Sequence, residues 1–112
     1  MPLLKIHSNT PIQNSHTLLA KASSKLAEIL GKPEKFVMLS LEHNPEMIFG
    51  GSDAPLLYIE LKSIGLPRDK TKEISSKLSE FLHQETGVPV DRMYIEFADA
   101  ERAMWGWNGA TF

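Results

Sequence analysis

Apolar residues recur along two stretches of the chain at the spacing of an amphipathic helix. The apolar positions are Leu18, Leu19, Ala22, Leu26, Ile29 and Leu30 in the first stretch, and Ile74, Leu78, Phe81 and Leu82 in the second. Residues three and four positions apart lie on one face of a helix. Both stretches therefore predict a helix that buries one side and exposes the other.

Residues at the ends of these stretches favour helix boundaries. Asn14 or Ser15 can cap the first helix, and Gly31 can end it. Pro67 suits the start of the second helix, and Gly87 suits its end.

Apolar runs beside turn-forming residues flank both predicted helices. We expect strands at residues 3–7, 36–43, 56–64 and 92–97. A strand–helix–strand unit pairs its two strands in parallel through a right-handed crossover. Two such units predict an α/β (α+β) fold, in which a four-stranded sheet carries both helices on one face.

The two halves of the chain repeat each other. Residues 2–6 (PLLKI) resemble residues 55–59 (PLLYI), which lie 53 positions later, and residues 22–30 resemble residues 74–82 at a spacing of 52. The Gly-Lys-Pro of residues 31–33 matches the Gly-Val-Pro of residues 87–89. We therefore predict a single domain over residues 1–112, made of two internal repeats at about 2–54 and 55–112.

A sheet with both helices on one face leaves its other face bare. The expected strands are apolar at Leu39 and Leu41, and partly so at the alternate positions Phe36, Met38 and Tyr58. This two-sided apolarity predicts that the second face meets another subunit.

The amino-acid composition of the chain excludes several kinds of site and several classes of partner. The 12 Lys and Arg residues against 14 Asp and Glu give a net charge of −2 at pH 7, so neither nucleic acid nor a membrane surface is an expected partner. The chain has no Cys, which excludes disulfides, thiolate nucleophiles and Cys-ligated zinc. No apolar run approaches the roughly 18 residues of a membrane span, and the N-terminal segment lacks a secretory signal. We predict a soluble cytoplasmic protein, whose release from a cell would need a non-classical route.

Pro2 is the first candidate for chemistry. Initiator Met is commonly removed before a small residue, and its removal here would leave a secondary amine at the start of the first strand. An α-amino group titrates near roughly 8, and burial or a nearby cation lowers its pKa towards that of a usable base at neutral pH. The simpler interpretation is that Pro2 only begins the strand. If Met1 stays, the Pro2 nitrogen is an amide without basicity.

Three further features have both a structural and a functional interpretation. Lys32 follows Gly31, where a cation complements a helix C-terminus, and it could also bind a substrate carboxylate. The turn at residues 63–65 could offer backbone N–H groups to an anion, and Tyr94 could either pack or donate its hydroxyl to a substrate. The four histidines show no metal-ligand spacing, so no metal site is predicted: His7, His16, His43 and His83.

The end of the chain is rich in aromatic residues. Trp105, Trp107 and Phe112 fall within the last eight positions, and Asn108-Gly109 favours a tight turn. This segment can be a tail docked on the protein or an apolar wall for an aromatic ligand. The two interpretations are compatible.

Six short motifs occur in one order along the chain. They are Met1-Pro2, Gly31-Lys32-Pro33, Phe49-Gly50-Gly51-Ser52, Ser63-Ile64-Gly65, Asp91-Arg92-Met93-Tyr94-Ile95, and Gly106-Trp107-Asn108 with Thr111-Phe112. Together they resemble the macrophage migration inhibitory factor family of the tautomerase superfamily, over essentially the whole chain. The resemblance implies two β-α-β units assembled as a homotrimer, with active sites at the subunit interfaces.

The resemblance also implies an activity: keto–enol tautomerisation of phenylpyruvate-type aromatic α-keto acids, without a cofactor. Pro2 would be the catalytic base, Lys32 and the backbone N–H of Ile64 would hold the substrate carboxylate, and Tyr94 would come from an adjacent subunit. The apolar pocket lining would be Leu3, Phe36, Trp107 and Phe112, with Trp105 near the rim.

The chain departs from the family pattern at three places. Residues 56–59 read Leu-Leu-Tyr-Ile where animal members have CxxC, which removes any thiol-oxidoreductase activity credited to that motif. Glu96 stands where Asn is common and adds a carboxylate near the pocket mouth, while Phe36 keeps the ring of a common Tyr without its hydroxyl. The alternative function is a cytokine-like interaction protein with a receptor-type partner and weak or vestigial tautomerase activity.

Overall fold

Six strands and two helices make up the chain, and the structure, a computed structural model, describes all residues from 1 to 112. The elements in chain order are β1 (Leu3–Ser8), α1 (Ser15–Leu30), β2 (Met38–His43), β3 (Leu57–Ile64), α2 (Thr71–Thr86), β4 (Met93–Ala100), β5 (Gly106–Trp107) and β6 (Ala110–Thr111). Four short 3-10 turns lie between them, at Glu34–Phe36, Arg68–Lys70, Val90–Arg92 and Arg102–Met104. No helix is long and apolar enough to cross a membrane.

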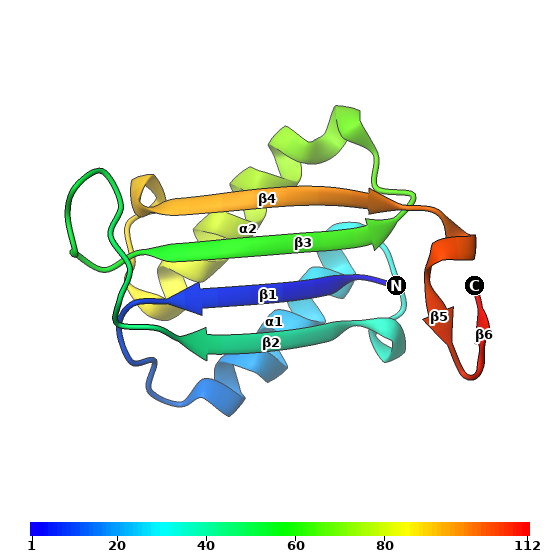
Figure 1. Cartoon of the computed structure of the whole chain (residues 1–112), viewed down its shortest axis with the longest axis horizontal. Helices are drawn as coiled ribbons and strands as arrows, with labels where there is room; N and C mark the ends of the chain where they lie inside the picture. Colours follow the sequence, from blue (N-terminus) through cyan, green and yellow to red (C-terminus); the bar gives the residue numbers. More distant parts are fainter.

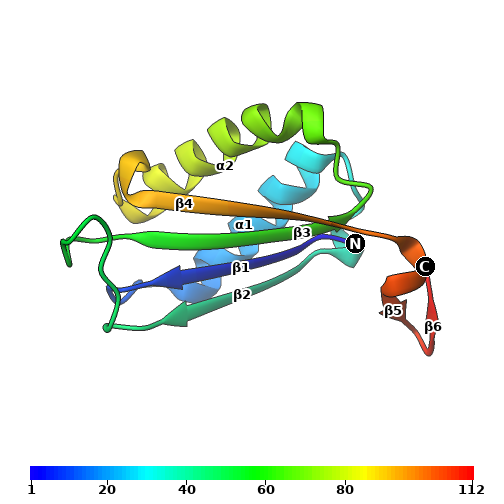
Figure 2. The same ribbon diagram turned by 45° about the horizontal axis from the view of Figure 1, so that its top comes forward.

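The first four strands form one sheet in the order β2-β1-β3-β4. β1 pairs in parallel with β2, β3 pairs in parallel with β4, and β1 and β3 lie antiparallel at the centre. Both helices cover the same face of this sheet (Figure 1; Figure 2). The predicted α+β fold of two β-α-β units is therefore confirmed.

The core lies between the sheet and the two helices. Alternation along the strands turns Leu4, Ile6, Ile59 and Leu61 toward the helices, and these side chains are almost completely buried. The helices meet them with the predicted apolar stripe: Leu18, Ala22, Leu26, Ile74, Leu78 and Leu82. Burial of each large side chain stabilises the fold by about 1.5–3 kcal/mol.

Both helices end at the predicted glycines. Gly31 and Gly87 have φ values of 63° and 78°, the left-handed conformation that a C-cap glycine adopts without strain. Asn14 occupies the N-cap of α1, but its side chain makes no capping hydrogen bond. α2 begins at Thr71, because a 3-10 turn separates Pro67 from the helix.

The bare face of the sheet corrects one prediction. Its side chains are mainly polar and include Lys5, His7, Ser40, Tyr58, Glu60 and Lys62. His7 contacts the carboxylates of Glu42 and Glu60 at 3.2 and 2.8 Å. Phe36 does not contribute to this face, because it lies in a 3-10 turn before β2. Met38 and Tyr58 do lie on this face as expected, and Met38 is 67 % exposed, but they lie among mainly polar side chains, so the expectation of two-sided apolarity holds only in part.

A small hairpin extends beyond the end of the sheet (Figure 1). β5 and β6 pair antiparallel, with Gly106 opposite Thr111 and Trp107 opposite Ala110. Asn108 and Gly109 connect them with φ values of 54° and 76°, as a two-residue turn with left-handed positions requires. The tight turn predicted at these two residues is confirmed.

Candidate active site

Pro2 stands immediately before the central strand β1. Its ring is almost completely buried, and its carbonyl oxygen accepts a hydrogen bond from the backbone N–H of Met38 at 3.0 Å. Leu3 next to it is paired with Met38 on one side and with Lys62 on the other. The first residues of the chain are therefore fixed by the sheet.

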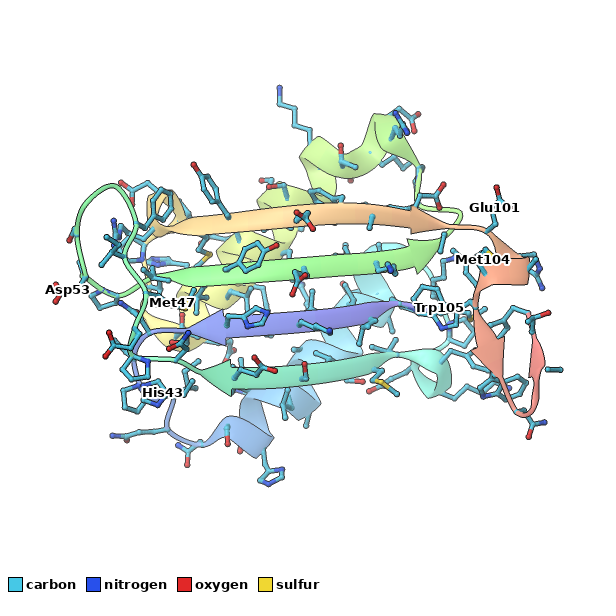
Figure 3. The ribbon with its side chains drawn as sticks, in the orientation of Figure 1. His43, Met47, Asp53, Glu101, Met104 and Trp105 are labelled. Atoms are coloured by element: carbon cyan, nitrogen blue, oxygen red, sulfur yellow. The ribbon has the colours of Figure 1, made fainter.

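A cavity of about 810 Å³ opens beside this N-terminal segment. Ten of its sixteen lining residues are hydrophobic. Five of the predicted site residues line it together: Pro2, Leu3, Phe36, Trp107 and Phe112. Trp105, predicted near the rim, also lines the cavity. Figure 3 shows Trp105 and Met104 where the hairpin segment meets the end of the sheet.

Three aromatic rings form one wall of the cavity. The rings of Trp107 and Phe112 stack at 5.3 Å, and the Phe36 ring meets both edge-on at 5.2 and 5.5 Å. The C-terminal residue is held in place because Arg102 donates a hydrogen bond to the Phe112 carbonyl oxygen at 3.0 Å. Such a wall offers an apolar surface that suits a flat aromatic ligand.

The N-terminal amine has an altered acidity. Burial, and secondly the positive charge of Lys32, lower the pKa of the Met1 amine below its ordinary value. The same two causes would act on a secondary amine at Pro2, whose ring is more deeply buried than Met1. Both causes therefore favour the neutral, proton-accepting form of an amine at this site.

Lys32 and Ile64 lie beside the cavity without lining it. Lys32 follows the C-cap of α1, and its ammonium donates a hydrogen bond to the Ile64 carbonyl oxygen at 2.7 Å. Lys32 lines a separate cleft of about 310 Å³ between the ends of the two helices. Ile64 is the buried last residue of β3, and Gly65 makes the turn after it with a φ of 67°.

Tyr94 lies far from Pro2 in the same chain. It is level with Tyr58 on β3, whereas the neighbour of Leu3 on that strand, Lys62, is level with Ala98. Four residues along a strand correspond to about 13 Å. Tyr94 is 64 % exposed and lies outside the cavity.

Glu96 also lies outside the cavity, although it was expected near the pocket mouth. It faces the open side of the sheet, on the same face as Tyr58 of β3. Burial raises the pKa of Tyr58, and the negative charges of Glu60 and Glu96 raise it further.

Comparison with known proteins decides the family. The family model described as macrophage migration inhibitory factor matches residues 1–112. The chain belongs to this family. It is therefore a member of the tautomerase superfamily, as its motifs predicted.

Relatives cover the chain from end to end. A macrophage migration inhibitory factor homolog of Brugia malayi is 41 % identical, covering 100 % of this chain and 99 % of the relative. A homolog of Trichuris trichiura is 38 % identical over the full length of both chains. Among solved structures, a homologue from Prochlorococcus marinus is 46 % identical with a TM-score of 0.91, and covers 98 % of each chain.

Several residues that line the cavity were not predicted from the sequence. Asp99 is one, and its carboxylate accepts hydrogen bonds from the backbone N–H groups of Leu66 and Ala100 at 3.0 and 2.9 Å. It thereby fixes the turn that follows β3. Lys35 is another, with its ammonium 5.1 Å from the centre of the Phe36 ring. The signal in the sequence that could have indicated Lys35 as a cavity residue is its position next to Phe36.

Proposed function

We propose that this protein is a keto–enol tautomerase of phenylpyruvate-type α-keto acids, with the Pro2 amine as catalytic base once Met1 has been removed. The place of Pro2 carries the proposal: it is buried at the start of β1 and lines an aromatic-walled cavity. The lowered pKa of the terminal amine supports it, because a base must be neutral to accept a proton.

The proposed reaction moves one proton between carbon and oxygen. The neutral Pro2 amine takes a proton from C3 of the keto acid, and the electrons of that C–H bond form the C2=C3 double bond. The electron pair of the C2 carbonyl moves to its oxygen, which takes up a proton from water to become the enol hydroxyl, and the protonated amine releases its proton to water. In the reverse direction, the amine, protonated from water, gives its proton to C3 while the enol hydroxyl releases its proton to water.

Lys32 and the Ile64 N–H would hold the substrate carboxylate in this proposal. A lysine ammonium has three N–H donors, and the Ile64 carbonyl oxygen takes one of them, so two remain. Met1 lines the cavity and its amine is close enough for the Lys32 charge to lower its pKa. Removal of Met1 would therefore open space toward Lys32.

The proposal includes a homotrimer in which an adjacent subunit supplies Tyr94. Tyr94 is exposed and lies at the other end of the sheet from Pro2, so the hydroxyl can reach a cavity only in another copy of the chain. The aromatic wall of Phe36, Trp107 and Phe112 would then hold the ring of the substrate.

The test compares Pro2→Gly with Pro11→Gly, a control in an exposed loop. General-base catalysis typically contributes about 10²–10⁴ in rate. Pro2→Gly replaces the secondary amine fixed by the ring with a primary amine on a flexible residue, so we expect it to lower phenylpyruvate ketonisation by about 100-fold and Pro11→Gly to leave it near wild type. A mass spectrum must show the N-terminus of each variant. Undiminished turnover in a correctly processed Pro2→Gly variant would overturn the proposal.

A second arm of the test separates the enzyme from a cytokine-like interaction protein. Insertion of Ala between Met1 and Pro2 makes the Pro2 nitrogen an amide, which is no longer a base. The tautomerase proposal expects this extended protein to lose activity and the wild type to have it. A wild-type protein with a free Pro2 amine and no ketonisation would instead support the interaction protein.

A further inference from the structure

The segment between β2 and β3 is firmly held although it contains no strand of the sheet. Phe49 and Ser52 exchange two backbone hydrogen bonds, at 2.9 and 3.1 Å, around a turn made by Gly50 and Gly51. Both glycines have positive φ, at 60° and 77°. In Figure 1 this loop extends from the end of the sheet opposite to the small hairpin, and Figure 3 places Met47 and Asp53 there.

Arg92 fastens this loop to the sheet. Its guanidinium donates hydrogen bonds to the carbonyl oxygens of Phe49 at 2.6 Å, Ser52 at 3.0 Å and Ala54 at 2.9 Å, with a longer one to Pro55 at 3.4 Å. The guanidinium carbon also lies 5.1 Å from the centre of the Phe49 ring. Only arginine combines a planar fork of five donors with a flat cation that stacks on an aromatic ring.

The loop in turn holds an aromatic ring against Tyr94. The centres of the Phe49 and Tyr94 rings lie 4.5 Å apart with the planes tilted by 36°. Tyr94 is otherwise largely exposed, and an exposed tyrosine samples several rotamers. Arg92 lies only two residues before Tyr94, so one side chain ties both the loop and the start of β4 together.

We infer that Phe49 and Arg92 are positioning residues, which hold the Tyr94 ring in the orientation that lets its hydroxyl reach the substrate in the cavity of a neighbouring subunit. This inference rests on the proposed function, because it assigns Tyr94 to substrate binding. Phe49 and Arg92 act through Tyr94 and touch no substrate themselves. An aromatic pair contributes a preference equivalent to about a three- to tenfold change in an equilibrium constant.

A double-mutant cycle tests the inference. Steady-state ketonisation of phenylpyruvate is measured for Phe49→Leu, Tyr94→Phe and the double variant, with Arg68→Met as a surface control. We expect Phe49→Leu to raise KM about three- to tenfold with kcat within about twofold of wild type. Once the Tyr94 hydroxyl is gone its orientation no longer matters, so the double variant should behave as Tyr94→Phe alone.

Two conservative variants separate positioning from loss of structure. Phe49→Tyr keeps a ring against Tyr94 and should restore the wild-type KM. Arg92→Lys keeps the positive charge but loses the planar guanidinium with its several N–H donors, so it should raise KM as Phe49→Leu does. Sedimentation of each variant reports whether the assembly is kept. If Phe49→Leu changes the assembly, the cycle is run with Arg92→Lys in its place.

The outcomes distinguish this inference from the proposed function. Additive effects of the two changes, or an unchanged KM in Phe49→Leu, would overturn the positioning role while the Pro2 result stands. A Tyr94→Phe variant with wild-type kinetics would remove Tyr94 from the substrate site and overturn both the inference and that part of the proposed function. Loss of the Pro2→Gly effect would overturn the catalytic proposal alone.

Discussion

The ammonium of Lys32 donates a hydrogen bond to the carbonyl oxygen of Ile64 across a distance of 2.7 Å. This contact joins the residue after the C-terminus of α1 to the last residue of β3. It holds a positive charge beside the N-terminal amine, whose pKa that charge helps to lower. The pKa of the Met1 amine therefore depends on a side chain 31 residues away in sequence.

Replacement of Lys32 by Gln should raise the pKa of the N-terminal amine. The cation favours the neutral amine, so its removal makes protonation easier, although burial, the larger cause, remains. The acidic limb of the pH profile of kcat/KM should move to higher pH in Lys32→Gln. Lys32→Arg keeps the charge and should leave the limb near its wild-type position. An acidic limb that does not move in Lys32→Gln would contradict this electrostatic role.

Removal of an indole from the aromatic wall should weaken substrate binding more than folding. Trp107 is 52 % exposed, so Trp107→Ala costs the fold little, but it takes away the ring that stacks on Phe112 and meets Phe36. We expect KM for phenylpyruvate to rise about tenfold, as the loss of one aromatic contact predicts. Trp107→Phe keeps a ring and should rise less. Equal KM values for the Ala and Phe variants would contradict the stacking role.

Local signals in the sequence predicted the elements well. Gly31 and Gly87 end the helices, and Asn108-Gly109 makes the hairpin turn, because each depends on the conformational preference of one or two residues. The order strand–helix–strand predicted the parallel pairing of β1 with β2 and of β3 with β4. Six residues that line the cavity were also predicted, because the chain resembles a known family.

Through-space relationships were not predictable in the same way. The pattern places both Phe36 and Met38 in a strand, but a 3-10 turn removes Phe36 from it, while Met38 begins β2. Asp99 was not predicted, because its role is to accept hydrogen bonds from two backbone N–H groups, one of which lies 33 residues earlier in the chain. Neighbours of that kind depend on the completed fold and leave no local pattern.

The pKa of Tyr58 should be higher than that of an ordinary tyrosine, because of the residues around it on the open face of the sheet. Burial and the carboxylates of Glu60 and Glu96 disfavour the negatively charged phenolate, so Tyr58 should ionise at higher pH than an ordinary tyrosine. The chain has two tyrosines, so a Tyr94→Phe background isolates Tyr58 in the ultraviolet absorbance. Glu96→Gln in that background should lower the pKa of Tyr58. An unchanged titration curve would show that Glu96 does not act on this phenol.

The same raised pKa has a consequence for stability at alkaline pH. Because Tyr58 holds its proton more tightly in the folded state than in the unfolded state, its contribution to folding is complete below the ordinary pKa of tyrosine. That contribution is lost as pH rises through the raised pKa. Tyr58→Phe cannot ionise and should therefore lose less stability between neutral and strongly alkaline pH than the wild type, in urea unfolding at matched protein concentration.

Asn9 should be the most sensitive support of the loop before β3. Its amide donates to the carbonyl oxygens of Asp53 at 2.9 Å and Ala54 at 3.2 Å, and its side-chain oxygen accepts from the N–H of Leu56 at 2.9 Å. Asn9 is only 8 % exposed and Leu56 only 3 %, so water cannot readily replace these hydrogen bonds. A buried donor left unpaired costs about 1–3 kcal/mol.

Asn9→Ala should therefore lower the free energy of unfolding by roughly 2–4 kcal/mol, since it removes three hydrogen bonds and leaves buried groups without partners. Asn44→Ala is the matched control, because Asn44 is exposed and its side chain accepts one hydrogen bond, from the N–H of Glu46. The control should change stability by less than about 0.5 kcal/mol. Urea unfolding at one protein concentration measures both variants. Equal losses in the two would mean that burial of the Asn9 amide, and so its hold on the loop, does not set the stability of this end of the sheet.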